Sequence, residues 1–217
     1  MITILVPAVL LIFFASLNLA PGGAGVGFLL PGMLALAIMA TGMVSLGIAT
    51  AYERHYGVLK RLGASPLPRW ALLSAKTLSV LSVEALQVIL LTAIAAILYQ
   101  WRPSGNVLAA VAVLILGTIV FSALGLYMAG AWRAEATLAG ANGLYLACLL
   151  LSGAVLPLDH LPASLRAVAR VLPPAALTDA LRGALNPGGS VPSSALLVLV
   201  AWAVVLVVLA VRTFQWE

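Results

Sequence analysis

Long runs of apolar residues, separated by short polar breaks, form the main pattern of this chain. Six runs stand out, at about residues 2–19, 27–52, 70–99, 107–131, 137–155 and 193–211. Each is close to the roughly 20 apolar residues that an α-helix needs to cross a bilayer. The pattern predicts an all-α, polytopic membrane protein with about six transmembrane helices, organised as one transmembrane domain over residues 1–217.

The composition supports a membrane location. Of the 217 residues, 64% are hydrophobic and only 8% are charged, whereas a soluble domain carries roughly a quarter charged residues. The first apolar run lacks the basic residues that open a cleaved signal peptide, so we interpret it as a retained span. Most of the outer surface is therefore expected to face lipid.

The basic residues predict the orientation of the spans, because Lys and Arg accumulate in short cytoplasmic loops. With both termini cytoplasmic, the outer side holds the smaller group, Arg102, Arg166, Arg170 and Arg182. The inner side then holds Arg54, Lys60, Arg61, Arg69, Lys76, Arg133 and Arg212. We expect a multi-pass protein of the cell (inner or plasma) membrane with both ends in the cytoplasm, and the Ala-, Leu-, Val- and Gly-rich usage suggests a bacterial source.

The segment between the second and third spans is the most charged part of the chain. On a helix over about residues 53–63, Glu53, Arg54, Lys60 and Arg61 share one face with Gly57 at its centre. The opposite face holds Tyr52, His55, Val58, Leu59 and Leu62. The pattern predicts a short amphipathic helix. Its spacing leaves open whether it contacts a protein partner, lies on anionic lipid or is a solvated loop.

The outer segment before the last span also predicts short helices. Pro162–Leu172 and Pro174–Leu185 each begin with proline, which suits the first turn of a helix. Apolar residues form a stripe on each helix. A hairpin over about residues 162–185 that dips into the outer leaflet and one that rests on the membrane surface would both bury these side chains.

Two stretches resemble a known family. The first is Phe28–Lys76, which contains the sub-motif ER-x-x-G-x-L-K-R-L-x-A-S-P-L over residues 53–67. The second, SGAVLPLDHLPASLRAVARVLPPAALTDALRGAL, covers Ser152–Leu185. These stretches resemble the coupling helix and the paired re-entrant helices of a type 2 ABC exporter permease, in the branch that exports drugs and polysaccharides.

The resemblance implies two sets of site residues. The cytoplasmic coupling helix would bind an ATPase subunit through Glu53, Arg54, Gly57, Leu59, Lys60 and Arg61. The re-entrant hairpin would close the outer end of the substrate path through Pro157, Leu161, Pro173 and Leu177. Members of this family begin with an amphipathic helix before the first span. The sequence shows no such helix, so it was lost or the true start lies upstream.

Three polar residues within the predicted spans are candidates for the substrate path. Glu84 and Gln87 share one face of the third span, and Asn142 lies between two glycines on the fifth. A carboxylate inside the membrane costs at least a few kcal/mol unless it is paired or faces water. These side chains therefore either line a watery cavity or form structural contacts with neighbouring helices, and for Asn142 helix packing is favoured.

The sequence contains no pattern that indicates ATP binding, metal binding or catalysis. No glycine-rich G-x-x-x-x-G-K-[ST] phosphate loop occurs, no His, Cys and carboxylate cluster has metal-ligand spacing, and no nucleophile–base pair is evident. No basic stretch suits nucleic acid. We therefore expect neither an enzyme nor a cofactor-binding or metal-binding chain. ATP and Mg would bind to a separate partner ATPase, two copies of which would dock on the complex.

The leading hypothesis is a permease subunit that moves an amphiphilic drug, lipid or lipid-linked glycan outward. The resemblance implies that a second permease copy, or a related permease, completes the path and that membrane lipid surrounds it. A proton-coupled secondary transporter using Glu84 is an alternative, although such carriers usually show internal repeats. A membrane scaffold that recruits a soluble partner through residues 53–63 is another.

Overall fold

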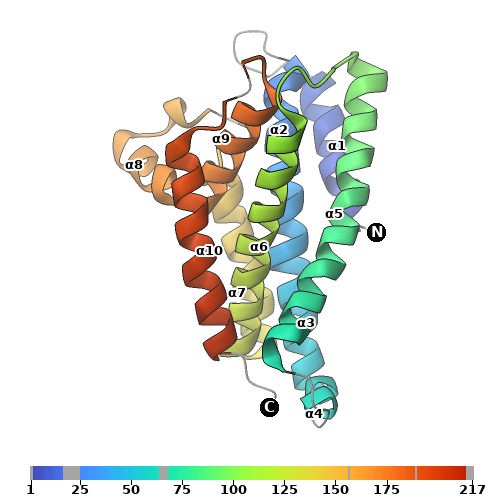
Figure 1. The fold of residues 1–217 in the computed structure, drawn as a ribbon, viewed down its shortest axis with the longest axis vertical. Coiled ribbons are helices and arrows are strands. Elements are labelled where there is room, and N and C mark those ends of the chain that lie inside the picture. The colour runs from blue at the N-terminus through green and yellow to red at the C-terminus, as the bar shows by residue number, and fades with distance from the viewer. Residues whose placement is uncertain (1, 17–24, 64–67, 156, 189, 214–217) are drawn as a thin grey trace.

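The computed structural model describes residues 2–16, 25–63, 68–155, 157–188 and 190–213. Within these residues it contains helices and no strands, so the predicted all-α class is confirmed. Five helices are long and apolar enough to cross a membrane, namely Gly25–His55, Trp70–Tyr99, Val107–Ala131, Ala134–Leu151 and Ser193–Thr213. They run side by side along the long axis of the molecule (Figure 1).

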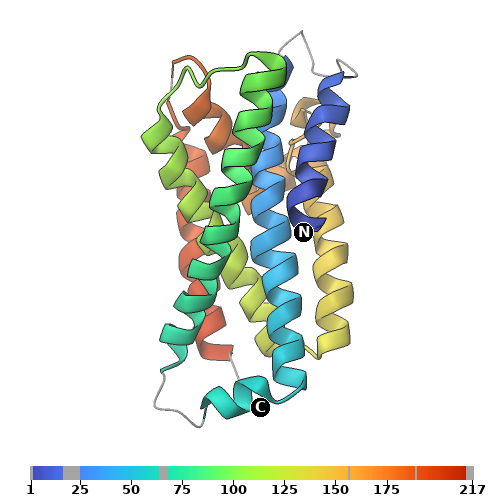
Figure 2. The same ribbon diagram turned by 90° about the vertical axis from the view of Figure 1, so that its right-hand side faces the viewer.

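The first predicted span differs from these five. Helix α1 covers Ile2–Ser16, which is 15 residues. At 1.5 Å per residue it is about 22 Å long, shorter than the ~30 Å thickness of the hydrocarbon core. It begins about half-way along the bundle (Figure 2) and ends beside α2 (Gly25–Ile38). Residues 17–19 of the predicted span lie outside the described residues.

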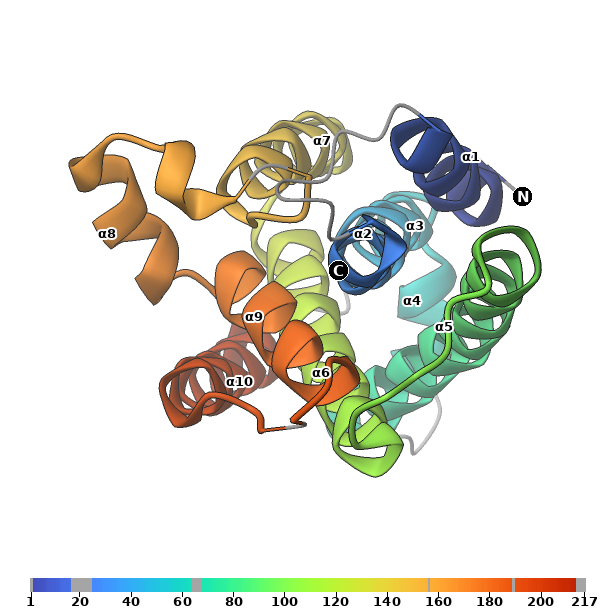
Figure 3. The ribbon, with the colours of Figure 1, turned by 90° about the horizontal axis from the view of Figure 1, so that it is seen from above.

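The second span forms the centre of the bundle. Helix α2 continues into a π-helical segment, η2 (Met39–Ser45), and then into α3 (Leu46–His55). Seen from above, α2 lies between α1, α5 (Arg69–Tyr99), α6 (Val107–Ala131) and α7 (Ala134–Leu151) (Figure 3). Of its most apolar 18-residue window, 78% is buried inside the protein.

Glycines bring this central helix and α6 into backbone contact. An added Cβ at Gly125 would lie 2.7 Å from the carbonyl oxygens of Gly42 and Met43. One at Gly47 would lie 3.0 Å from the Gly125 oxygen. Small residues permit this close approach, which is a main source of helix association in lipid. The helices therefore pack backbone to backbone along η2 and α3.

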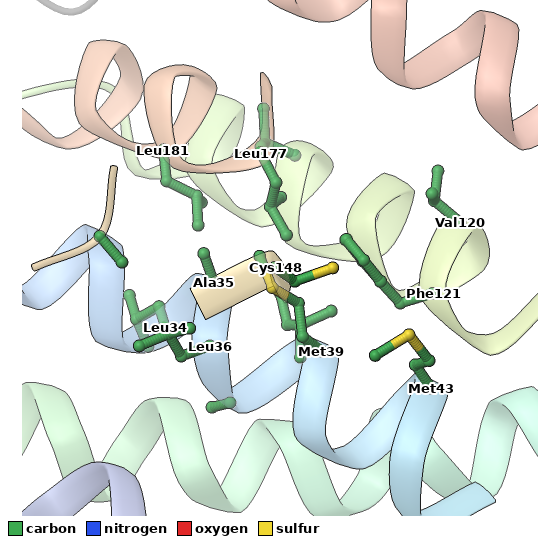
Figure 4. Packing of buried hydrophobic residues seen from close by; sticks show 14 of the residues in the cluster. Leu34, Ala35, Leu36, Met39, Met43, Val120, Phe121, Cys148, Leu177 and Leu181 are labelled. Atoms are coloured by element: carbon green, nitrogen blue, oxygen red, sulfur yellow. The ribbon is translucent and has the colours of Figure 1, made fainter. Parts of the chain in front are cut away.

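Aliphatic and sulfur-containing side chains fill the space between the helices (Figure 4). Met39 and Met43 of η2 face Phe121 of α6, and all three are fully buried. Leu177 and Leu181 of α9 (Pro173–Leu185) cover this cluster from the opposite side. The core therefore joins the central helix to α6 and α9.

The two ends of the bundle carry different elements. One end holds α4 (Val58–Gly63), the start of α5, the turn from α6 to α7 and the end of α10 (Ser193–Thr213). The other end holds the 3₁₀ turn η3 (Leu158–His160), α8 (Ala163–Val171) and α9. The basic residues assigned to the inner side by sequence belong to elements of the α4 end.

The charged segment contains a break that the sequence did not predict. The charged segment was expected to form one helix over residues 53–63, but α3 ends at His55 and α4 begins at Val58. Gly57 between them has φ +74°, a left-handed conformation that interrupts an α-helix. The outer segment, predicted as two helices, forms two helices that are separated at Leu172, whose extended backbone suits a residue before proline. The fifth predicted span, residues 137–155, corresponds to α7, which runs from Ala134 to Leu151.

Candidate functional site

The last turn of α3 is tied to two other helices through adjacent charged residues. Glu53 forms an ion pair with Lys76 of α5. One guanidinium nitrogen of Arg54 donates a hydrogen bond to the carbonyl oxygen of Gly130, and the other donates one to the carbonyl oxygen of Trp132. Both oxygens lie at the carboxyl end of α6, where helix carbonyls lack intrahelical partners. The family resemblance implies that Glu53 and Arg54 contact an ATPase, and in the structure both side chains bond to the protein's own helices.

The next residues divide into a buried anchor and an exposed surface. Leu59 of α4 is fully buried, so it fastens α4 against the bundle. Lys60 and Arg61 are exposed, as are Tyr56 at 72% and Val58 at 43%. We call Tyr56, Val58, Lys60 and Arg61 the α4 surface. The left-handed conformation of Gly57 changes the direction of the chain between Tyr56 and Val58. In one continuous helix these two side chains would point in other directions.

A charged cleft adjoins the end of α3. It has a volume of about 530 Å³ and is lined by Ala51, Arg54, His55, Arg133, Ala134 and Glu135. It therefore lies between α3 and the start of α7, at the same end of the molecule as α4. Sequence analysis did not identify this cleft, because its two walls are about 80 residues apart in the chain.

A buried polar cluster links α5 to the central helix and to α6. Glu84 and Gln87 of α5 are 4% and 1% exposed. Thr118 of α6 donates its hydroxyl to Oε2 of Glu84, and the Thr41 hydroxyl of η2 lies 3.1 Å from Oε1 of Gln87. Oε1 of Glu84 has no hydrogen-bond partner among the described residues. Both candidates therefore cross-link helices in this conformation.

Asn142, the third candidate for the substrate path, is not part of this cluster. It lies on the exposed side of α7, and its side-chain amide donates to the carbonyl oxygen of Leu138 at 2.8 Å. The structure thus brings Glu84 and Gln87 together and places Asn142 on another surface of the chain. Within the described ranges, no three His, Cys, Asp or Glu residues are grouped as metal ligands.

The outer helices differ in burial. Pro173 and Leu177 of α9 are buried, and Leu177 fills the space left by Gly117 of α6. Pro157 and Leu161, the other two candidates for an outer gate, are half-buried. Helix α8 instead projects from the bundle (Figures 1 and 3) and exposes its apolar stripe at Leu165, Val168 and Val171. Only α9 is thus integrated into the core.

Arg182 of α9 holds this outer end together. It donates to the carbonyl oxygen of Gly153, which follows α7, at 2.6 Å, and its guanidinium lies 3.7 Å from the centre of the Phe28 ring of α2. Burial lowers the pKa of Arg182 to about 10, while Asp179 raises it, so the side chain stays protonated near neutral pH. The sequence indicated only the i,i+3 spacing with Asp179, whose oxygen is 3.9 Å away.

Comparison with known proteins gives one match. The family model described as ABC-2 type transporter matches residues 1–186. No curated protein and no solved structure matches the chain. The matched region contains the α4 surface, the polar cluster and both outer helices.

Proposed function

Since this chain belongs to the ABC-2 type transporter family, we propose that it is the permease subunit of an ATP-driven exporter. It is a multi-pass membrane protein and a membrane subunit of an ABC-2 type transporter. In the proposed complex, two separate ATPase subunits bind ATP and Mg, and a second permease copy or a related permease completes the path. The substrate is an amphiphile, namely a drug, a lipid or a lipid-linked glycan.

The observation that supports this proposal most directly is the composition of the α4 surface. It combines an exposed tyrosine and valine with two exposed basic residues, at the end of the bundle richest in Lys and Arg. Aromatic residues and arginine are enriched at protein–protein interfaces. Cytoplasmic loops are enriched in Lys and Arg. The α4 surface is therefore suited to bind a cytoplasmic ATPase.

The contacts of α3 suggest how a displacement of α4 reaches the spans. Glu53 joins the end of α3 to α5, and Arg54 joins it to the carboxyl end of α6. The buried Leu59 joins α4 to the same region. A push on the α4 surface would thus act on several spans at once. Glu53 and Arg54 act in this proposal as positioning residues, and the α4 surface makes the contact.

A second candidate function rests on Glu84. Its buried carboxyl group has one oxygen without a described partner, and ionisable residues inside membranes often belong to proton paths. A proton-coupled carrier would use this group. The exposed aromatic and basic side chains of the α4 surface favour the ATP-driven proposal, because a proton-coupled carrier has no need of a surface that binds a cytoplasmic partner.

The first experiment measures retention of the partner ATPase and ATP hydrolysis in nanodiscs. We expect Arg61→Ala to weaken ATPase binding by about tenfold, the usual effect of removing an interface residue worth 1–2 kcal/mol, with no change in melting temperature. Arg212→Ala is the matched control, since Arg212 is an exposed cation at the same end, in the last turn of α10, but outside the α4 surface and the cleft.

Arg54→Ala separates contact from positioning. Because Arg54 bonds two carbonyl oxygens of α6, its loss should lower the melting temperature as well as uncouple hydrolysis from substrate. If the wild-type chain retains no ATPase, the exporter proposal is wrong. If the ATPase binds and Arg61→Ala has no effect, the exporter proposal stands but the α4 surface is not the contact.

A further inference from the structure

A well at the end of the bundle that holds α8 and α9 takes no part in the contacts described above. It has a volume of about 670 Å³, within the range of about 300–1,000 Å³ that is typical of small-molecule sites. Its walls come from the end of α1, the start of α2, the segment that joins α5 to α6 and the residues that follow α9. Figure 3 looks down on this end of the molecule. We call this space the outer well.

The outer well is lined by both aromatic rings and hydrogen-bonding groups. Phe28, Tyr99 and Trp101 supply the rings. Ser104 supplies a hydroxyl group and Asn186 an amide. Ligand sites generally combine an apolar or aromatic wall with a few polar groups that fix the orientation of the ligand. The lining of the outer well has this composition.

Two of these polar groups converge over Gly27. A Cβ added to Gly27 would lie 3.6 Å from Nε1 of Trp101 and 3.9 Å from Oδ1 of Asn186. Within the described part of the chain, neither of these side chains forms a hydrogen bond. Both are half-buried. Because glycine has no side chain, a ligand can approach the backbone between these two groups and bond to both.

Backbone contacts hold the walls of the outer well in place. The N–H of Trp101 donates to the carbonyl oxygen of Ala95 at 3.1 Å, which fixes the start of the joining segment. The N–H of Asn106 donates to the carbonyl oxygen of Ala184 at 2.8 Å, and a Cβ added to Gly105 would clash with the same oxygen. The joining segment is therefore packed against α9. A site that is formed in advance lowers the entropic cost of binding.

The charge and the lining together indicate the class of ligand. Arg102 is the one charged side chain among the described lining residues, so the outer well favours an anion over a cation. An alkyl chain would leave the polar groups unbonded, and a small inorganic anion would leave the aromatic rings uncovered. A sugar ring satisfies both, because it has a C–H face that packs on an aromatic ring and hydroxyl groups that bond to amide and indole groups.

We propose that the outer well binds an acidic saccharide. The sugar ring packs on Trp101, its hydroxyl groups bond to Asn186 and Ser104, and its acidic group pairs with Arg102. The outer well and the α4 surface lie at opposite ends of the bundle. The proposal therefore does not rest on ATP-driven export.

Saturation-transfer difference NMR of the wild-type chain in nanodiscs tests this proposal without any partner protein. The probes are glucuronate and glucose, titrated separately, with empty nanodiscs as the blank. The two sugars share a ring and differ at one carboxylate, so their comparison isolates the acidic group. We expect transfer to the ring C–H protons of both sugars. The dissociation constant should be about fivefold lower for glucuronate, the preference that an exposed ion pair provides at its strongest.

Matched variants assign binding to the outer well. Trp101→Leu should abolish transfer to both sugars, whereas Trp70→Leu, an exposed tryptophan at the opposite end, should not. Arg102→Gln should make the two sugars equivalent. Arg170→Gln, which changes an exposed arginine of α8 outside the outer well, should leave the preference for glucuronate intact.

Three results would overturn the proposal. No transfer to either sugar from the wild-type chain would mean that the outer well is not a saccharide site. Equal dissociation constants would mean that the acidic group is not recognised. Full transfer in a folded Trp101→Leu protein would place binding elsewhere. Because Arg102→Gln alters an exposed side chain, its result does not depend on whether Trp101→Leu folds. None of these results bears on whether the chain binds an ATPase.

Discussion

Glu84 has one carboxylate oxygen bonded by Thr118 and another without a partner among the described residues. In a bilayer such a side chain could serve the fold, by cross-linking α5 to α6, or could serve transport, by exchanging a proton. The two roles differ in what a neutral substitute of the same shape would do. Glutamine keeps the acceptor for Thr118 but cannot exchange a proton.

We predict that Glu84→Gln changes the free energy of unfolding by less than about 1 kcal/mol, since the bond to Thr118 is kept. Substrate-stimulated ATP hydrolysis should also persist. Thr118→Val is the comparison, because it removes the donor and leaves a buried carboxyl unbonded, at a cost of about 1–3 kcal/mol. Thermal unfolding in detergent measures the stability of the two variants, and ATP hydrolysis in nanodiscs measures their activity. A folded Glu84→Gln protein without transport would instead favour proton coupling.

For single residues, the sequence predicted the helix face on which a side chain lies better than the groups that the side chain contacts. Glu84 and Gln87 were placed on one face of a helix, and both take part in the same buried cluster. Glu53 and Arg54 were predicted to contact a partner from the family resemblance, and their bonds to Lys76 and to α6 were not predicted. A helical wheel shows which direction a side chain takes, but it does not show which distant helix lies there.

At the scale of helices, glycine spacing determines how closely the central helix and α6 approach. The contact between Gly125 and the backbone of Gly42 and Met43 involves carbonyl oxygens, which cannot move without shifting a whole helix. Gly143 of α7 provides a contrast, because an added Cβ there would meet nothing within 4 Å. Both glycines belong to long helices, so their intrinsic cost to the helix is the same.

We predict that Gly125→Ala lowers the free energy of unfolding by about 1–3 kcal/mol, as overpacking does in a close-packed interior. Gly143→Ala should leave stability unchanged or raise it by up to about 1 kcal/mol, the gain in helix propensity. Melting temperatures of the two purified variants in the same detergent provide the comparison. Equal melting temperatures would show that the helices can separate at Gly125 without cost.

The existence of the helices followed from hydropathy, but their breaks and neighbours did not. Gly57 was expected within a helix, since one glycine is tolerated there, and only the fold reveals its left-handed backbone. Helix α10 is the most apolar span, yet only 22% of its window is buried, against 78% for the second span. Lipid and protein interior are equally apolar, so hydropathy does not identify the central helix.

For the whole molecule, the distribution of charge predicts which end faces the cytoplasm. The α4 end contains the elements with most of the basic residues, and the opposite end contains α8 and α9. Two exposed polar side chains mark these ends, Lys60 on α4 and Arg170 on α8. Cys148 is buried, and it can be replaced so that labelling reports only on introduced cysteines.

We predict that Arg170→Cys, on the polar face of α8, reacts with an impermeant maleimide in sealed spheroplasts when Cys148 is replaced by Ala. Lys60→Cys should react only after the membrane is permeabilised, because the positive-inside rule places it in the cytoplasm. Leu177→Cys, which is fully buried, should react in neither case and is the control. The opposite pattern for Lys60 and Arg170 would invert the topology and remove the α4 surface from the reach of a cytoplasmic ATPase.

The π-helical segment Met39–Ser45 also has a consequence for the ancestry of this chain. A π-helix accommodates more residues per turn than an α-helix, so deleting one residue there can restore α geometry. Such a deletion would preserve the faces of the helix on both sides, including the bonds of Glu53 and Arg54. Relatives should therefore tolerate a one-residue gap within 39–45 far better than one in 46–55, where every later side chain would rotate by about 100°.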